Sequence, residues 1–259
     1  MSVPDFHMVL AILGIALAGG VIGLDRTAAG QFMISQPIVA GPLTGWLLGD
    51  PAAGAVIGAT LELIWVLDLP IGTFVPANAT VGTVSATAIA ALGSPGGASL
   101  PVIGFSIMLT TAMVPITMMA DGLVRQWNSR IADKALAASG RLGGAVLSRI
   151  QCAGLGFFFL KSFVLYILFI PLGLAAVALF GRLPLVFHRA LALFVRLLPL
   201  VGVALVMSKL SVNTFDKYFF LGFACAVIAG QLFYAPALIV LLTTVAAGLL
   251  GARYRERKS

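Results

Sequence analysis

Four long stretches of the chain lack Asp, Glu, Lys and Arg, and they constrain the fold more than any other feature of the sequence. They run between Asp5 and Asp25, Asp68 and Asp121, Lys161 and Arg182, and Lys217 and Arg253. A membrane-spanning helix needs about 20 predominantly apolar residues, so these stretches supply one, about two, one and up to two passes. The sequence therefore predicts an all-α polytopic membrane protein.

The composition supports a membrane location. Of the 259 residues, 60% are hydrophobic and 10% are charged, whereas soluble domains carry about 25% charged residues. Soluble enzymes, disordered chains and nucleic-acid-binding modules are excluded on this ground. The net charge of +7 agrees with the excess of basic residues in the cytoplasmic loops of membrane proteins.

The pattern of breaks and charges divides the chain into three regions. Residues 1–120 form an N-terminal membrane region in which Gly and Pro predict discontinuous or re-entrant helical hairpins. Residues 121–161 form a polar, basic cytoplasmic loop, with a helix expected over Ala132–Ala138. Residues 162–259 form a C-terminal membrane region of longer spanning helices with a basic cytoplasmic tail. Arg182, Arg189 and Arg196 do not fit this orientation, and an amphipathic interfacial segment over 182–198 is the preferred interpretation.

Two short apolar pieces between Pro37 and Trp65 meet at Gly49-Asp50-Pro51, which is the pattern of a helical hairpin. The second piece carries Glu62 among apolar neighbours. An ionisable group inside a membrane costs about 2.5–3.5 kcal/mol on insertion scales, so it marks a functional site by default. The alternative is a protonated Glu62 that hydrogen-bonds to Thr60 or Ser85.

The next segment, from Pro70 to Pro76, predicts extended backbone whose polar groups can bind hydroxyls beside Asn78. Carboxylate and amide groups suit the paired hydroxyls of a sugar, and an aromatic ring suits its apolar face. The predicted substrate-binding residues are Glu62, Asn78, Gln36, Asp25 and Trp65.

No motif predicts a metal site, a cofactor or a catalytic centre. The two cysteines, Cys152 and Cys225, are far apart, and His7 and His188 are the only histidines. Neither an HExxH motif nor a Gly-x-Ser-x-Gly elbow occurs, which disfavours an intramembrane enzyme.

Several segments of the N-terminal region together resemble the IIC membrane subunit of the mannose/fructose/sorbose family of bacterial sugar phosphotransferase systems. They are Leu24-Asp25, Gln36-Pro37 through Gly49-Asp50, Gly58 through Trp65, and Pro70-Ile71-Gly72 through Pro76. The resemblance implies a multi-pass protein of the bacterial cytoplasmic membrane that partners a IID membrane subunit. It also implies cytoplasmic IIA and IIB proteins that relay phosphate to the sugar through histidines, while the IIC chain itself is not phosphorylated.

Two departures from the family pattern concern candidate site residues. Family members commonly have Arg-Pro where this chain has Gln36-Pro37, and Pro-Asp where it has Ala77-Asn78. The loss of a carboxylate at position 78 removes charge but keeps hydrogen bonding, so the identity of the sugar is not carried over. The leading hypothesis is a subunit that translocates a hexose-type sugar. A diverged regulatory or assembly subunit and an ion-coupled carrier remain alternatives, and a homo-oligomer is compatible with the sequence.

Overall fold

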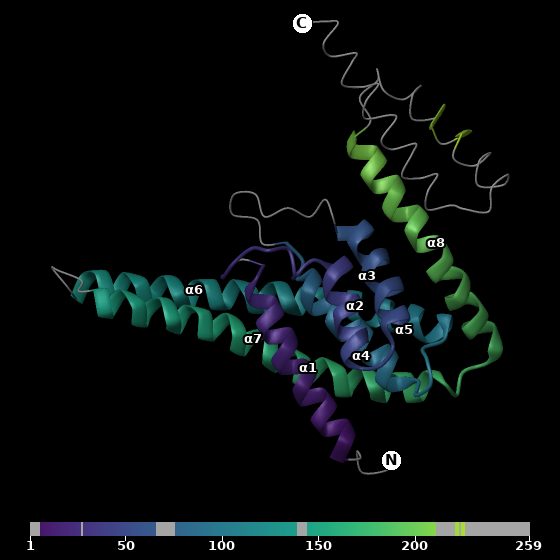
Figure 1. Cartoon of the computed structure of the whole chain (residues 1–259), viewed down its shortest axis with the longest axis horizontal. Coiled ribbons are helices and arrows are strands. Elements are labelled where there is room, and N and C mark those ends of the chain that lie inside the picture. Colours follow the sequence, from purple (N-terminus) through teal and green to yellow (C-terminus); the bar gives the residue numbers. More distant parts are fainter. Residues whose placement is uncertain are drawn as a thin grey trace, which may run out of the picture. The chain divides into compact units, whose positions relative to one another are not determined.

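The computed structural model describes residues 6–26, 28–65, 76–138, 144–210, 221–222 and 224–225, which contain helices and no strand. The helices, in chain order, are α1 (Phe6–Leu24), α2 (Pro37–Leu47), α3 (Pro51–Trp65), α4 (Ala79–Gly93), α5 (Leu100–Ala112), α6 (Val114–Ala138), α7 (Gly144–Phe180) and α8 (Leu185–Leu210) (Figure 1). The predicted all-α fold is confirmed. The chain divides into two compact units after Val206, and the bundle below belongs to the first unit.

Three helical segments are long and apolar enough to span a membrane: Phe6–Leu24, Ser148–Phe180 and Leu185–Val206. A fourth span is formed if α5 and the first part of α6 count as one helix bent by 42°. The break lies at Met113, immediately before Val114 and Pro115. A proline ring clashes with the carbonyl four residues earlier, so Pro115 prevents one straight helix from continuing through this point. Of the up to two passes expected between Lys217 and Arg253, the structure describes only residues 221–222 and 224–225, which are helical.

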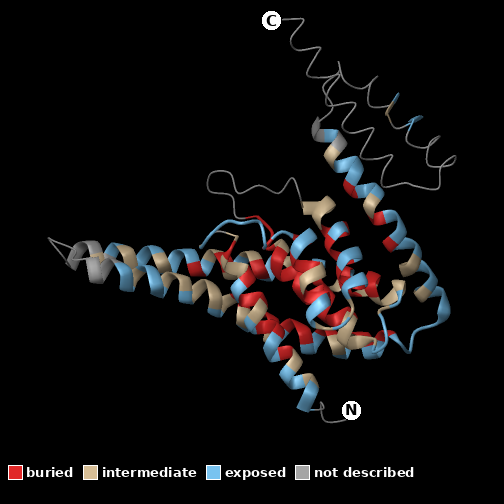
Figure 2. Cartoon of the chain, in the orientation of Figure 1, coloured by how far each residue is buried: buried red, intermediate tan, exposed pale blue. Residues whose placement is uncertain are grey.

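Helix α4 forms the centre of the bundle, and every residue from Thr80 to Ala90 is buried (Figure 2). It packs against α1, α2, α3, α5 and α7. Val81, Val84 and Ala88 join a core with α1 and α7, while Ala86 and Ala90 join a second core with α3, α5 and α8. Small side chains make this close packing on all sides sterically feasible.

The predicted helical hairpin is confirmed in α2 and α3. Gly41 and Gly45 of α2 face Gly54 and Gly58 of α3, so the two backbones touch. A Cβ atom added at Gly41 would lie 2.5 Å from the carbonyl oxygen of Gly54, well inside van der Waals contact. At the turn, Gly49 adopts a φ of +83°, which glycine accommodates without strain.

The turn of this hairpin is held by Asp50. Its Oδ1 accepts a hydrogen bond of 3.0 Å from the backbone N–H of Ala53, in the first turn of α3. Its Oδ2 accepts a bond of 2.7 Å from the N–H of Ala98, in the connection between α4 and α5. One carboxylate therefore caps α3 and ties the hairpin turn to the neighbouring helix pair.

The region expected as a polar loop, residues 121–161, is helical throughout its described part. Helices α6 and α7 run side by side and extend beyond the central bundle as a two-helix arm (Figure 1). Trp127 of α6 and Phe157 of α7 meet edge to face along this arm, with ring centroids 6.2 Å apart. Figure 2 shows that burial falls off along the arm with distance from the bundle.

Candidate functional site

The predicted site residues lie where α1 and α3 end and α2 and α4 begin. This region, called the polar end of the bundle, contains Asp25, the segment from Ser35 to Ile38, Glu62, Trp65 and Asn78. The contacts described below connect these parts, which are widely separated in the sequence. Helix termini leave backbone N–H and carbonyl groups without intrahelical partners, so polar side chains gather there for a physical reason.

Asp25 follows α1 and organises the connection to α2. Its Oδ1 accepts a hydrogen bond of 2.6 Å from the N–H of Phe32, and its Oδ2 accepts one of 3.1 Å from the N–H of Ser35. Burial alone raises the pKa of this carboxyl, but hydrogen bonds from the N–H groups of Phe32, Ser35 and Ile34 outweigh it, so the pKa lies below its ordinary value. Asp25 is therefore an ionised anchor for the loop.

The same loop is joined to the central helix. The hydroxyl of Thr80, in the first turn of α4, donates a hydrogen bond of 2.7 Å to the carbonyl oxygen of Ser35. Both residues are buried. The backbone of Ser35 is thus held on one side by Asp25 and on the other by α4, and this fixes where α2 begins.

Glu62 lies on α3 and binds the beginning of α2. Its Oε2 accepts a hydrogen bond of 3.2 Å from the backbone N–H of Ile38. Gln36 occupies the N-cap of α2 but its side chain makes no capping bond, so the Glu62 carboxylate supplies an acceptor that the cap residue does not. The side chain is half-buried.

The partner of Glu62 differs from those considered in the sequence-based alternative. Thr60 instead donates its hydroxyl proton to the carbonyl of Val56, one turn earlier on α3, at 2.7 Å. The hydroxyl of Ser85 has no hydrogen-bond partner among the described residues. Glu62 therefore joins α3 to the beginning of α2.

Gln36 and Trp65 occupy different environments at this end. Gln36 is exposed. Trp65 is half-buried and its ring packs against α4, because a Cβ atom added at Gly82 would lie 2.8 Å from that ring. Gly82 makes room for the indole, which forms part of the wall between α3 and α4.

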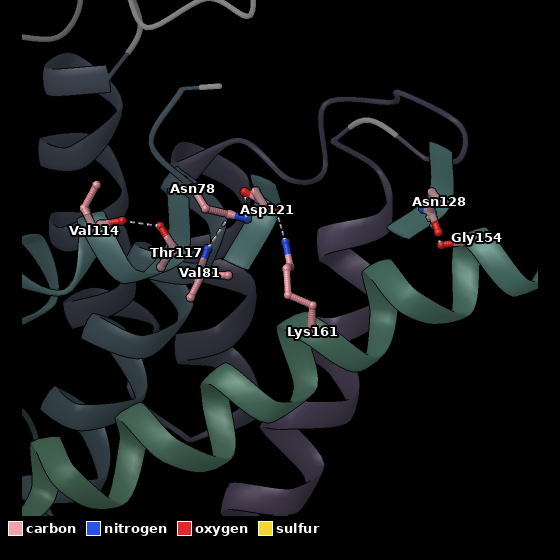
Figure 3. A network of polar contacts seen from close by, with 8 residues as sticks. All are labelled: Asn78, Val81, Val114, Thr117, Asp121, Asn128, Gly154 and Lys161. Atoms are coloured by element: carbon pink, nitrogen blue, oxygen red, sulfur yellow. Dashed lines mark hydrogen bonds and ion pairs between the residues drawn. The ribbon is translucent and has the colours of Figure 1, made fainter. Parts of the chain in front are cut away.

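Asn78 connects the central helix to the arm through a polar network (Figure 3). Its Oδ1 accepts a hydrogen bond of 3.2 Å from the N–H of Val81 and so caps α4. Its Nδ2 donates a bond of 3.1 Å to Oδ2 of Asp121 on α6. The other oxygen of Asp121 forms an ion pair with the Nζ of Lys161 on α7. Three elements are thus joined at one carboxylate.

Sequence reasoning missed the roles of Asp121 and Lys161. Asp121 ends one charge-free stretch and Lys161 begins another, so in the sequence both mark boundaries of the basic loop. Their side chains are 10% and 7% exposed. Charged groups are rarely buried unless they are paired. An acid and a base at the edges of two apolar stretches were therefore the sequence signal for a buried ion pair.

A row of hydroxyls leads from the polar end into the bundle. Thr80, Thr83 and Thr87 are three and then four residues apart on α4, so they share one face of the helix. All three are buried. Thr83 and Thr87 have no hydrogen-bond partner within the described part of the chain. Buried hydroxyls without partners are energetically costly and offer donors and acceptors to a polar solute.

The polar groups described at this end of the bundle suit hydrogen bonding. The described residues contain no group of three or more His, Cys, Asp or Glu side chains that could hold a metal ion. Carboxylates, an amide and hydroxyls are present instead. Such a set of donors and acceptors matches a polyhydroxylated molecule.

Comparison with known families gives a consistent result. The sequence model of the family described as the PTS system sorbose-specific IIC component matches residues 8–250. Over 232 residues the chain is 27% identical to the mannose-specific EIIC component of Escherichia coli, a match covering 87% of this chain and 82% of that protein. It is 24% identical to the fructose permease IIC component of Bacillus subtilis over 86% of this chain and 79% of that one.

A third relative matches a shorter region. The putative N-acetylgalactosamine permease IIC component 2 of Escherichia coli is 36% identical over 81 residues, which cover 31% of this chain. The matched part spans 60% of that relative's length. The three relatives are described with different sugars, so the comparison does not single out one substrate.

Two solved structures share the fold. A structure described as a membrane protein has a TM-score of 0.69 at 23% identity and covers 96% of both chains. The mannose transporter ManYZ, solved in complex with a microcin, has a TM-score of 0.54 at 22% identity, with 99% of this chain and 97% of that chain covered. At these identities the likeness concerns the fold alone.

Proposed function

The chain belongs to the family of sorbose-specific IIC components of the sugar phosphotransferase system, and we propose that it forms the pathway by which a hexose-type sugar crosses the bacterial inner membrane. In this proposal it acts with a IID subunit, and a cytoplasmic IIB protein, charged by IIA, phosphorylates the sugar. The chain supplies transport rather than catalysis. The family match favours this over a non-transporting or ion-coupled role.

One observation supports the proposed sugar site above the others. Asp25, Gln36, Glu62, Trp65 and Asn78 span 54 positions, from 25 to 78, yet the hydrogen bonds at Ser35, Ile38 and Thr80 bring their segments together at helix ends. Broken helices with polar termini are the usual setting for substrate sites in transporters. We propose that Glu62 and Asn78 bind sugar hydroxyls, with Trp65 beside them and Gln36 at the exposed margin.

The orientation of the site follows from the arm. Arg125 and Arg130 lie on α6, and Arg149 lies near the start of α7. Basic residues of this kind favour the cytoplasmic side, so we propose that residues 121–161 face the cytoplasm, as does the basic C-terminus. The Asn78–Asp121 bond lies at the base of the arm. The polar end would then open toward the side on which IIB delivers phosphate.

Uptake and phosphorylation of radiolabelled hexoses test this proposal. The chain is co-expressed with its IID, IIA and IIB partners in cells that lack other hexose transporters. Glu62→Gln keeps an oxygen that can accept the Ile38 N–H but removes the charge, and Asn78→Ser keeps an N-cap acceptor but removes the donor to Asp121. We expect Glu62→Gln to raise the KM for sugar by about tenfold, as for the loss of one hydrogen bond to a charged group, and Asn78→Ser to raise it by about threefold to tenfold, as for the loss of a neutral one.

Asp50→Asn provides the matched control. This change also converts a carboxylate to an amide on the α2–α3 hairpin, but at its turn, where the amide oxygen can still accept from Ala53 and only the bond from Ala98 is lost. It should leave the KM unchanged. Normal KM values for both Glu62→Gln and Asn78→Ser, at wild-type expression, would remove the proposed site from consideration.

A further inference from the structure

The bundle contains an apolar groove at the end opposite the polar end. Its volume is about 400 Å³, and the residues that line it include Met8, Leu92, Val102, Val177 and His188. These residues belong to the beginnings of α1, α5 and α8 and to the ends of α4 and α7. The groove is therefore built where five helices begin or end.

The position of the groove corresponds to one boundary of a membrane. Helix α7 contains Lys161, at the polar end, and also reaches the groove at Val177 to Phe180. At about 1.5 Å per residue, α7 rises about 24–29 Å over this distance. The hydrocarbon core of a bilayer is about 30 Å thick. With the polar end at one surface, the groove lies at the level of the opposite headgroups.

Two exposed arginines flank the groove. Arg182 follows the lining residue Gly181 in the turn between α7 and α8, and Arg189 follows the lining residue His188 on α8. The sequence contains no Asp or Glu between Asp133 and Asp216, so neither α7 nor α8 offers a carboxylate to neutralise them. The arginines also lie at the end where the basic-residue rule predicts few positive charges.

The wall between these arginines is fixed. The ring centroids of His188 and Phe180 are 4.4 Å apart. The Nδ1 of His188 is 3.3 Å from the carbonyl oxygen of Pro184. Phe180 in turn stacks on Phe105 of α5, with centroids 4.6 Å apart. The apolar surface beside the arginines is therefore part of the packed bundle.

We propose that this groove binds an anionic phospholipid of the surrounding bilayer. The phosphate group is bound by Arg182 and Arg189, and one acyl chain lies in the groove against α4 and α7. An apolar hollow beside cationic side chains at headgroup depth matches both parts of such a lipid. A free phosphate would use only the arginines and a neutral lipid only the groove.

Arg196 provides a matched control. Like Arg189, Arg196 is exposed, and it lies seven residues further along α8. This separation corresponds to about 10 Å along the helix axis. Neither Arg196 nor its chain neighbours Val195 and Leu197 line the groove. Loss of its charge changes the net charge of the helix to the same extent as loss of Arg189, without affecting the proposed site.

Native mass spectrometry of the full-length chain in detergent tests the proposal. The protein is incubated with equal amounts of phosphatidylglycerol and phosphatidylcholine that carry the same acyl chains. The wild type should retain phosphatidylglycerol over phosphatidylcholine by about tenfold, since each arginine near the headgroups favours an anionic lipid. Arg182→Gln combined with Arg189→Gln should abolish the preference, while Arg196→Gln should preserve it. Ala178→Phe, which fills the groove, should lower the retention of both lipids.

Three results would overturn the proposal. Equal retention of the two lipids by the wild type would show that the headgroup charge is not recognised. A loss of preference in Arg196→Gln as large as in the double variant would indicate general charge attraction. Displacement of the lipid by glycerol phosphate at equal concentration would assign the arginines to a soluble anion instead.

Discussion

Replacing Asp121 by Asn should destabilise the bundle strongly, because it leaves the ammonium group of Lys161 buried without a counter-charge. The two side chains are only 10% and 7% exposed, so solvent screens their interaction little. Removing one partner of a buried ion pair costs about 3–5 kcal/mol, most of it the penalty for the remaining charge. We expect a loss of this size in the free energy of unfolding of Asp121→Asn.

The double variant separates this cause from general damage to the α6–α7 contact. Lys161→Met alone leaves the carboxylate of Asp121 with Asn78 as its described partner and should also be costly. In the Asp121→Asn/Lys161→Met combination neither member of the pair carries a charge. Replacement of a complete buried pair by neutral side chains is often close to neutral. The combined loss should therefore be smaller than either single loss, with a coupling energy of about 3 kcal/mol.

Unfolding by sodium dodecyl sulfate in mixed micelles, followed by the fluorescence of the three tryptophans, measures these free energies. The wild type and the three variants are compared at one pH and one lipid-to-detergent ratio. A loss below about 1 kcal/mol in Asp121→Asn would contradict the estimate for a buried pair. Strict additivity of the two single losses would show that the residues do not interact.

Two further changes test the hairpin and the loop that precedes it. Gly41→Ala should lower the free energy of unfolding by about 1–3 kcal/mol through overpacking, because the new Cβ would lie 2.5 Å from the Gly54 carbonyl oxygen. Gly14→Ala, which meets no atom within 4 Å, is the control and should have no cost in the same assay. The pKa of Asp25 is lowered in the folded protein. The ionised carboxylate therefore stabilises the fold fully above the unfolded-state pKa of about 3.9. This stabilisation is lost as the pH falls through the lower folded-state pKa. The difference in melting temperature between wild type and Asp25→Asn should be constant from pH 5 to 7 and shrink only below about pH 4; shrinkage already near pH 6 would refute the assignment.

The hairpin was predictable because its determinants are local. The Gly49-Asp50-Pro51 turn separates two apolar pieces that are each too short to span, and these features need no knowledge of distant contacts. The contact between the helices depends on matching glycines at positions 41 and 54, and its closeness emerged only from the structure. The arm was less predictable, because a polar composition is compatible both with a loop and with helices that project from the bundle.

The sequence predicts candidate site residues, but it does not predict their partners in the fold. Glu62 is a candidate because its carboxylate lies among apolar neighbours in the sequence. Its partner is a backbone N–H group 24 positions away. Every residue but proline carries such a group, so the residue type does not reveal the partner. The Asp121–Lys161 pair joins positions 40 apart. Each residue by itself has the sequence pattern of the end of a membrane segment. Only the packing of α6 on α7 shows that the two charges form a buried ion pair.

The hydrogen bonds also indicate which parts of the bundle move together. The α2–α3 hairpin is tied to the α4–α5 pair at both ends, by Asp50 to Ala98 and by Ser35 to Thr80. Between these ends, glycine packing holds α2 on α3 without side chains that could slide. The unit α2–α5 continues into α6 through Met113, and the amide-carboxylate bond between Asn78 and Asp121 adds a side-chain contact between α4 and α6. A transport cycle that rocks α4 against α6 would have to change that bond, so the effect of Asn78→Ser on transport also tests whether these two helices move against each other.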